Sequence, residues 1–172
     1  FHVKKAKTYG IEFSSTFELS NQFKIKVSNY HLYAKDISAL NDFKNGLVFS
    51  RDRETLQSFR LTKKDYFGLL NRARNQLNIN MKYEIKKLNT NLNLNLIHKT
   101  KIGFRDTNGN SYLDKYDNFS RGHILSSFTI EKKILKMLRT QFIVKNILNY
   151  IDEINFINNP GRTFYTRIIF GR

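Results

Sequence analysis

A two-residue period of hydrophobicity runs through most of this chain and restricts what it can fold into. Apolar side chains occupy every second position in several segments, and the clearest run is Asn91-Leu92-Asn93-Leu94-Asn95-Leu96. Such alternation is typical of β-strands with one apolar and one polar face, and it does not fit an amphipathic helix. The segments run for about nine residues or more, as do the strands of outer-membrane barrels, whereas strands of soluble proteins are usually shorter.

The alternation predicts an all-β fold in which antiparallel strands pair with their nearest neighbours in the chain. We predict seven strands, at about residues 6–19, 23–37, 72–86, 88–105, 119–131, 137–149 and 162–172. Helix is expected only inside the segment 53–70. An alternative reading makes 131–149 a helix, because Ile134, Leu135, Leu138 and Phe142 have partly helical spacing.

The connections between these strands alternate in length. The short ones are residues 20–22, 86–89 and 131–136, and the long ones are about 38–70, 105–118 and 150–160. Short turns at one rim and long loops at the other are the layout of a bacterial outer-membrane barrel. A compact soluble domain rarely carries a long loop that has no function.

In such a barrel the apolar side chains of the strands face lipid and the polar ones face the lumen. Those expected to face lipid are Ile11, Phe13, Phe17, Phe23, Ile25, Val27, Leu77, Ile79, Met81, Leu92, Leu94 and Leu96. Those expected to face the lumen include Lys24, Lys26, Lys82, Lys99 and Lys101. A basic lumen would attract an anionic substrate, unless carboxylates elsewhere in the barrel balance it.

Seven strands do not close a bacterial single-chain barrel, because these barrels have even strand numbers. Open edges would leave unpaired backbone groups in hydrocarbon. We therefore expect residues 1–172 to need further strands, and not to form a stable barrel alone. The opening Phe1-His2-Val3 has neither a Met nor a signal region, and we expect a fragment or a processed N-terminus.

Composition excludes several classes of function. The chain has 172 residues, 30 Lys and Arg against 14 Asp and Glu, a net charge of +16, and no Cys. Disulfide scaffolds, zinc ribbons, iron–sulfur clusters and thiol nucleophiles are therefore excluded. The histidines, at positions 2, 31, 98 and 123, lack metal-ligand spacing, and no catalytic motif is present, so we expect no enzyme. The positive charge fits a nucleic-acid binder, a surface for an anionic ligand, or a compositional bias.

Several short motifs resemble those of TonB-dependent outer-membrane receptors. Val144-Lys145-Asn146-Ile147-Leu148-Asn149 is similar to the "V-x-N-L-x-D" of the family's penultimate strand, with Ile147 for Leu and Asn149 for Asp. Pro160-Gly161-Arg162-Thr163-Phe164 resembles the "P-G-R-x-F" that opens the last strand. Thr8-Tyr9-Gly10-Ile11-Glu12 resembles a "T-x-G-x-E" strand, and the segment Arg72–Asn78 resembles a strand start after a long loop.

This resemblance implies a 22-stranded barrel with an N-terminal plug, of which residues 1–172 would be the C-terminal part. The plug, its energy-coupling segment and about fifteen strands would lie outside these residues. It also implies the cell outer membrane as location, and lipid, the plug, the remaining strands and the TonB complex as partners. The function implied is energy-coupled uptake of a siderophore, haem, cobalamin or a glycan. The family usually ends on an aromatic residue, whereas this chain ends Phe170-Gly171-Arg172.

Two other functions stay open at this stage. A soluble basic β-protein would bind nucleic acid through its Lys, Arg, Tyr and Phe side chains, whereas the leading interpretation has no nucleic-acid partner. A structural barrel subunit of an envelope complex is the other alternative.

One loop has the spacing of a calcium site. Residues 106–117 place oxygen-bearing groups where an EF-hand loop has its ligands. The candidate ligands are Asp106, Asn108, Asn110, the Tyr112 carbonyl, Asp114 and Asp117. Ser111 stands where that loop has a glycine, and Asp117 where it has a bidentate Glu. The alternative is a polar turn, with Lys115 or Arg105 neutralising the carboxylates. Calcium is the only cofactor that the sequence suggests.

Overall fold

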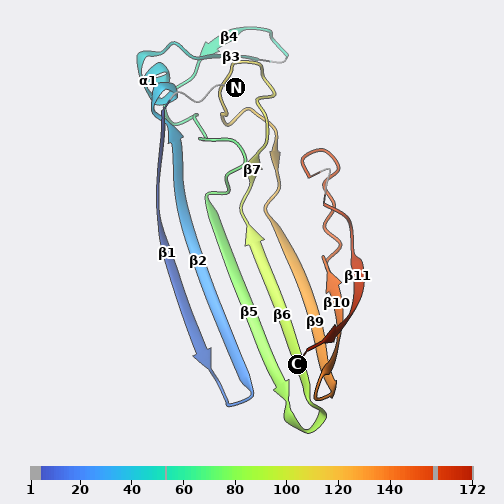
Figure 1. Ribbon diagram of the computed structural model, residues 1–172. Helices are drawn as coiled ribbons and strands as arrows, with labels where there is room; N and C mark the ends of the chain where they lie inside the picture. The colour runs from blue at the N-terminus through green and yellow to red at the C-terminus, as the bar shows by residue number, and fades with distance from the viewer. Residues whose placement is uncertain (1–4, 53, 157–158, 172) are drawn as a thin grey trace. The chain divides into compact units, whose positions relative to one another are not determined.

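The computed structural model describes residues 5–52, 54–156 and 159–171. Its main feature is a sheet of seven strands that follow one another in chain order (Figure 1). The strands are β1 (Ala6–Glu18), β2 (Phe23–Asp36), β5 (Asn75–Ile85), β6 (Thr90–Lys99), β9 (His123–Leu135), β10 (Leu138–Lys145) and β11 (Thr163–Phe170). The predicted antiparallel meander is confirmed.

The strand ends differ from the prediction in places. The predicted strand 88–105 ends at Lys99, and residues beyond it form the short strand β7 (Ile102–Gly103), which pairs with β8 (Phe119–Ser120). A 3₁₀ turn, η1 (Lys86–Leu88), joins β5 to β6. The helical reading of 131–149 is wrong, since β9 and β10 form a tight antiparallel hairpin there.

The chain divides into two compact units, which are described separately below. Unit 1 takes in residues 1–11, 31–75 and 100–122, and unit 2 takes in residues 12–30, 76–99 and 123–172. Unit 1 is therefore built from the first residues of β1, the last residues of β2 and the two longest predicted loops. Unit 2 holds the strands with the clearest alternation.

Unit 1 contains the helix α1 (Ile37–Asn45), which lies outside the segment expected to be helical. Asp36 caps its N-terminus by accepting a hydrogen bond from the Ser38 N–H at 2.8 Å, and Gly46 ends it with a left-handed φ of 69°. Both are ordinary helix-boundary signals. The described part of 53–70 has no helix, and it contains β4 (Ser58–Arg60), which pairs with β3 (Phe49–Arg51).

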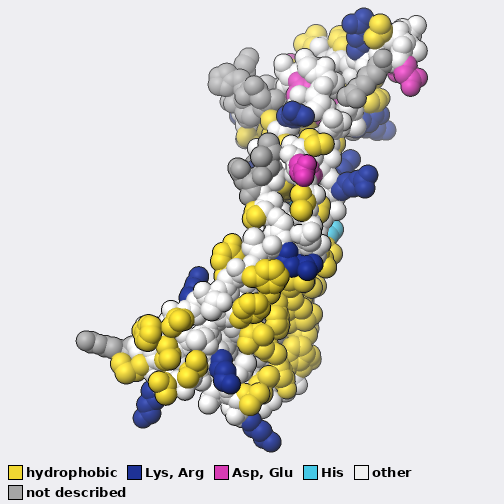
Figure 2. Space-filling model, turned by 90° about the vertical axis from the view of Figure 1, so that its right-hand side faces the viewer, with side chains coloured by type: hydrophobic (Ala, Val, Ile, Leu, Met, Phe, Trp, Pro, Cys, Tyr) yellow, Lys and Arg dark blue, Asp and Glu magenta, His cyan; other side chains and the backbone are white. Residues whose placement is uncertain are grey.

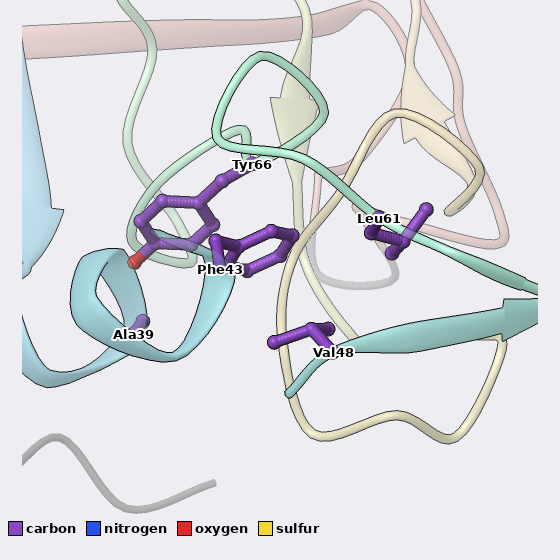
Figure 3. Packing of buried hydrophobic residues seen from close by; sticks show 5 residues of the cluster. All are labelled: Ala39, Phe43, Val48, Leu61 and Tyr66. Atoms are coloured by element: carbon purple, nitrogen blue, oxygen red, sulfur yellow. The ribbon is translucent and has the colours of Figure 1, made fainter. Parts of the chain in front are cut away.

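The buried core of the described residues lies in unit 1. Ala39 and Phe43 of α1 pack with Val48, Leu61 and Tyr66 from the chain that follows (Figure 3). The Phe43 and Tyr66 rings stack with their centroids 5.0 Å apart. The long loop predicted at 38–70 is therefore a folded element. Among the described residues, no helix has the length and apolar character needed to cross a membrane.

Candidate functional site

The strands of unit 2 separate apolar and polar side chains onto opposite faces. Register places Met81, Leu94, Phe128, Val144 and Phe164 side by side across five strands. The next row along, on the other face, contains Asn80, Asn95, Ser127, Lys145 and Thr163. In these rows the apolar residues of each strand thus pair with apolar residues of the next strand, and the polar residues pair with polar ones. The sheet therefore has one apolar and one polar face.

The apolar face of unit 2 has no helical layer of its own, because the described part of this unit contains no α-helix. None of the side chains expected to face lipid is buried in either unit, and Ile11 and Phe13 are 79% and 64% exposed. Hydrophobic side chains gather in a patch on the face that Figure 2 shows. An uncovered apolar surface of this kind needs a lipid or protein partner.

Side-chain amides bond to one another on the polar face. The Asn80 amide donates to Asn93 Oδ1 at 2.8 Å, and the Gln76 amide donates to Asn78 Oδ1 at 2.8 Å. Gln141 donates to Glu131 on the neighbouring strand. These groups offer donors and acceptors to water or to a polar solute while they hold one another in place.

A hollow of about 380 Å³ lies on this polar face, and both signs of charge line it. Its lining includes the cations Lys24 and Lys82 and the carboxylates Glu84 and Glu131, together with Asn91, Asn93, Thr129 and Gln141. Lys24 also pairs with Glu18 at 2.6 Å. Two of the five lysines that were expected to make the lumen basic, Lys24 and Lys82, therefore have carboxylates beside them on this chain's own strands.

The positions of the other three lysines differ. By alternation, Lys99 lies on the polar face with Asn95, and Lys26 lies on the same side of β2 as Lys24. Lys101 follows the end of β6, and its ammonium lies 4.7 Å from the centroid of the Phe119 ring. It therefore belongs to unit 1 and not to a long strand.

The motif residues of the C-terminal segment hold a loop in unit 2 together. The buried Asn146 donates to the carbonyls of Tyr150 and Pro160, at 2.8 and 3.1 Å, and accepts from the Tyr150 N–H at 2.9 Å. Arg162 donates through Nε to the Ile147 carbonyl at 3.0 Å. Asn146 thus ties the end of β10 to the segment that opens β11, and Arg162 anchors the same loop.

Two motif glycines are needed because of close approach and not because of a positive φ. A Cβ on Gly161 would lie 2.8 Å from the Asn149 side-chain oxygen. A Cβ on Gly10 would lie 2.4 Å from the His31 carbonyl oxygen, on the strand beside it. Neither glycine is among those with positive φ, so both positions are restricted by the space beside them and not by a left-handed backbone.

The carboxylates of the predicted calcium loop, residues 106–117, accept hydrogen bonds from the loop itself. Asp106 accepts from the N–H groups of Gly109, at 2.7 Å, and Ser111, at 2.6 Å. Asp114 Oδ2 accepts from the side-chain amides of Asn108, at 2.9 Å, and Asn110, at 2.7 Å. The bonds make a closely folded polar loop in unit 1.

Other polar side chains of this loop also have partners within unit 1. Asp117 accepts from the Thr107 N–H at 2.6 Å, and burial raises the pKa of Asp117, with the Asp114 carboxylate adding to the rise. Lys115 forms an ion pair at 2.7 Å with Asp65, a residue outside the loop. The Tyr112 hydroxyl donates to Asp42 at 2.7 Å, and burial together with this bond raises the pKa of Tyr112 to about 12.

Ser111 takes the left-handed conformation expected of the glycine that it replaces, with a φ of 71°. Within the part of the chain that the structure describes, however, no three His, Cys, Asp or Glu side chains form a group able to hold a metal. Calcium binding at residues 106–117 stays a prediction. His31, His98 and His123 form no such group either, and His2 lies outside the described residues.

Sequence reasoning missed a basic hollow in unit 1, of about 320 Å³. Its lining combines the end of β2 with the segment 63–74, and includes His31, Lys35, Lys63, Lys64, Arg72 and Arg74. The adjacent pair Lys63-Lys64 and the spacing Arg72-x-Arg74 were the available signals. We call this group the basic hollow below.

Solved structures of siderophore receptors resemble this chain. The ferric enterobactin receptor PfeA of Pseudomonas aeruginosa, solved as a G324V mutant, matches with a TM-score of 0.63 and 17% identity over 98% of this chain. PfeA carrying Q482A, solved with enterobactin, matches with a TM-score of 0.63 and 15% identity over 98% of this chain. The siderophore receptor PiuA of Acinetobacter baumannii matches with a TM-score of 0.55 and 12% identity over 84% of this chain.

The chain spans only about a fifth of these receptors, 22% of the first and 18% of PiuA. No protein-family model matches the sequence, and no curated protein does. At these identities the comparison concerns the fold. The seven-stranded antiparallel sheet is similar to the barrel portion of TonB-dependent receptors, as the sequence motifs led us to expect.

Proposed function

We propose that this chain forms part of the barrel of a TonB-dependent transporter in the outer membrane. One observation carries the proposal: the strands of unit 2 align apolar side chains on one face and amide and hydroxyl side chains on the other, and the described residues of that unit include no α-helix to cover the apolar face. A transmembrane barrel has this division, with lipid on the apolar side and water on the polar side.

The polar face supplies the surface that a solute passes. Its amides act as donors and acceptors, and Lys24 is paired there with Glu18 and Arg139 with Glu131. Such a surface suits a passage for polar cargo more than a high-affinity anion site. Binding selectivity then lies in the outer loops and in the plug.

The proposal needs partners for the end strands of the sheet. In the described residues β1 pairs only with β2, and β11 only with β10. Unpaired backbone groups at those edges are costly in lipid, so we propose that further strands continue the sheet on both sides. The plug and the contact with the TonB complex belong to the same completed receptor.

We propose a siderophore as the first cargo to test, ahead of haem, cobalamin and glycans. The neighbours PfeA and PiuA support this order, because the structures are described as a ferric enterobactin receptor and a siderophore receptor. The function proposed is energy-coupled transport, without enzymatic chemistry.

The test uses the native gene product in its own host. Membrane fractionation should place it with outer-membrane markers, and its deletion should abolish uptake of one ferric siderophore in a panel, with uptake restored by the wild-type gene. Loss of the same uptake in a strain lacking TonB completes the expected result.

Three other outcomes contradict the proposal. Recovery in the outer membrane with no uptake defect across siderophores, haem, cobalamin and glycans indicates a structural barrel subunit. Uptake that persists without TonB rules out energy coupling through that complex. Recovery in the soluble fraction without detergent, with nucleic acid that is released by rising salt, indicates the basic nucleic-acid binder instead.

A further inference from the structure

The basic hollow of unit 1 concentrates positive charge that no carboxylate offsets. None of its lining residues is Asp or Glu. In the part of the chain that the structure describes, none of its Lys or Arg side chains makes an ion pair; the pairs found are Lys24–Glu18, Lys115–Asp65 and Arg139–Glu131. A cluster of like charges without counter-ions is unfavourable unless an anion joins it.

Carbonyls and aromatic rings hold two of these cations in place. Lys35 donates to the Tyr66 carbonyl at 2.6 Å, and its ammonium lies 4.4 Å from the centroid of the Tyr66 ring. Arg74 donates to the Phe67 carbonyl at 2.7 Å, and its guanidinium lies 4.1 Å from the centroid of the Phe67 ring. These contacts orient the cations without neutralising them, so the hollow keeps its charge.

The side chains along β1, one of the strands beside the hollow, follow an order from charged to aromatic to apolar. Along β1 the side chains of one face are Lys7, then Tyr9, then Ile11, the last two being 54% and 79% exposed. The Lys7 ammonium lies 5.3 Å from the centroid of the Tyr9 ring. A cation, then an aromatic ring, then an apolar side chain is the order expected from headgroup level into lipid.

The neighbouring strand β2 repeats the first two steps of this order. Tyr33 stacks on Tyr9 with ring centroids 4.5 Å apart, and Lys35 follows Tyr33 on the same face, with its ammonium 5.8 Å from the Tyr33 centroid. Because Lys35, Tyr33 and His31 also line the hollow, the hollow opens beside the cationic end of this sequence of side chains. In a membrane, that level holds the phosphates of lipid headgroups.

We propose that the basic hollow binds a phosphate-bearing lipid headgroup of the outer leaflet. Arg72 and Arg74 present planar guanidinium groups, which pair with phosphate oxygens bidentately, and Lys63 and Lys64 add point charges. The ligand fixes the level of unit 1 at the membrane surface. This inference rests on the proposed membrane location and adds a ligand that the transport function does not require.

The test compares two double variants of the whole receptor. Lys63→Gln with Lys64→Gln removes two exposed charges from the hollow, and Lys86→Gln with Lys87→Gln removes two exposed charges from the β5–β6 turn. None of these four side chains makes a described hydrogen bond or ion pair, so both variants should fold. Resistance of the barrel to unfolding in detergent, read as a gel-mobility shift on heating, checks this.

Binding is measured in detergent micelles doped with a bisphosphorylated glycolipid, with the same glycolipid dephosphorylated as control, by native mass spectrometry. We expect the wild type and the Lys86/Lys87 variant to bind the phosphorylated form, and the Lys63/Lys64 variant to bind it about tenfold or more weakly. Equal binding of the dephosphorylated form, or equal loss in both variants, overturns the proposal.

Competition with inorganic phosphate distinguishes a site for a lipid headgroup from a site for a free phosphate ion. If millimolar phosphate displaces the glycolipid completely, the hollow is a free-anion site and the proposal is wrong. Because binding is measured in micelles, it is independent of uptake: failure of siderophore transport with glycolipid binding intact refutes only the proposed function, and the reverse result refutes only this inference.

Discussion

An arginine placed on the apolar face of the sheet should cost far more than one placed a single residue further along. Leu94 lies near the middle of β6 and is paired with Met81 and Phe128, so an arginine there finds only apolar side chains directly across. Asn95 is paired with Asn80 and Ser127 on the other face. Comparing Leu94→Arg with Asn95→Arg therefore tests which face of the sheet meets lipid, because both variants introduce the same side chain.

The expected costs follow from what each face meets. A lipid-facing Arg or Lys at the middle of a membrane strand costs about 2–4 kcal/mol, whereas an exposed polar position usually changes stability by roughly 0.5 kcal/mol or less. The difference, at least about 1.5 kcal/mol, amounts to roughly tenfold or more in the folding equilibrium. The assay is urea titration of the full-length receptor folded into lipid vesicles, followed by protease protection and the heat-dependent gel shift.

A control separates membrane burial from ordinary packing. The same two variants are titrated in short-chain and long-chain lipid vesicles, because the cost of a lipid-facing charge depends on its depth. We expect Leu94→Arg to become less costly in the thinner bilayer and Asn95→Arg to stay unchanged. Equal costs for the two variants, or a greater cost for Asn95→Arg, would refute the assignment of lipid to the apolar face.

Four further predictions follow from particular contacts. Nitroxide labels placed singly along residues 91–96 should alternate between oxygen and nickel-chelate accessibility with a period of two; a uniform profile contradicts the two-faced strand. Asn146→Ala should destabilise the receptor by about 1–3 kcal/mol, because it removes the three hydrogen bonds that a buried side chain makes to the loop backbone, while the exposed Asn91→Ala should change it little; equal effects would show that the loop does not depend on Asn146. Burial raises the pKa of Tyr66 to about 12, so unit 1 should lose stability as pH rises from about 10 to about 12, by roughly 2–3 kcal/mol, and Tyr66→Phe should flatten this loss in alkaline unfolding curves. Terbium titration should show saturable, calcium-competed luminescence from the loop 106–117 with micromolar to millimolar affinity; its absence, or its persistence in Asp106→Ala with Asp117→Ala, excludes calcium there.

The long strands were predictable because the sequence of each one alternates between apolar and polar residues. Alternation in segments such as 91–96 specifies which residues share a face, and register is then restricted because a one-residue slip would bring apolar side chains to the polar face. Short connections between neighbouring strands left a meander as the simple topology. The strand ends were less predictable, since Thr100 and Lys101 continue the composition of β6 although the strand stops at Lys99.

Unit 1 was not foreseen, although part of its signal was in the sequence. Asp36 and Gly46 bracket α1 as cap residues, and Lys44 lies in its last turn, so the sequence between them carries helix-boundary signals although its apolar residues are few. The helix expected within 53–70 rested on scattered apolar residues with no cap. The basic hollow was harder to predict, because Lys35 and the segment 63–74 are distant in sequence and come together through tertiary contacts such as the hydrogen bonds from the Leu32 N–H to the Arg74 carbonyl at 2.7 Å and from the Leu69 N–H to the Ala34 carbonyl at 3.1 Å.

The charge of the chain can now be assigned to particular surfaces. On the polar face of the sheet, lysines and arginines have Glu18, Glu84 and Glu131 as close neighbours, so that surface has both signs of charge. The basic hollow has cations alone. A compositional bias toward lysine would raise positive charge on every exposed surface alike, whereas here carboxylates accompany the cations on one surface and are absent from the other. The lining that has cations and no carboxylate thus includes Tyr33, which stacks on Tyr9, and in the proposed membrane location this level would hold the phosphates of lipid headgroups.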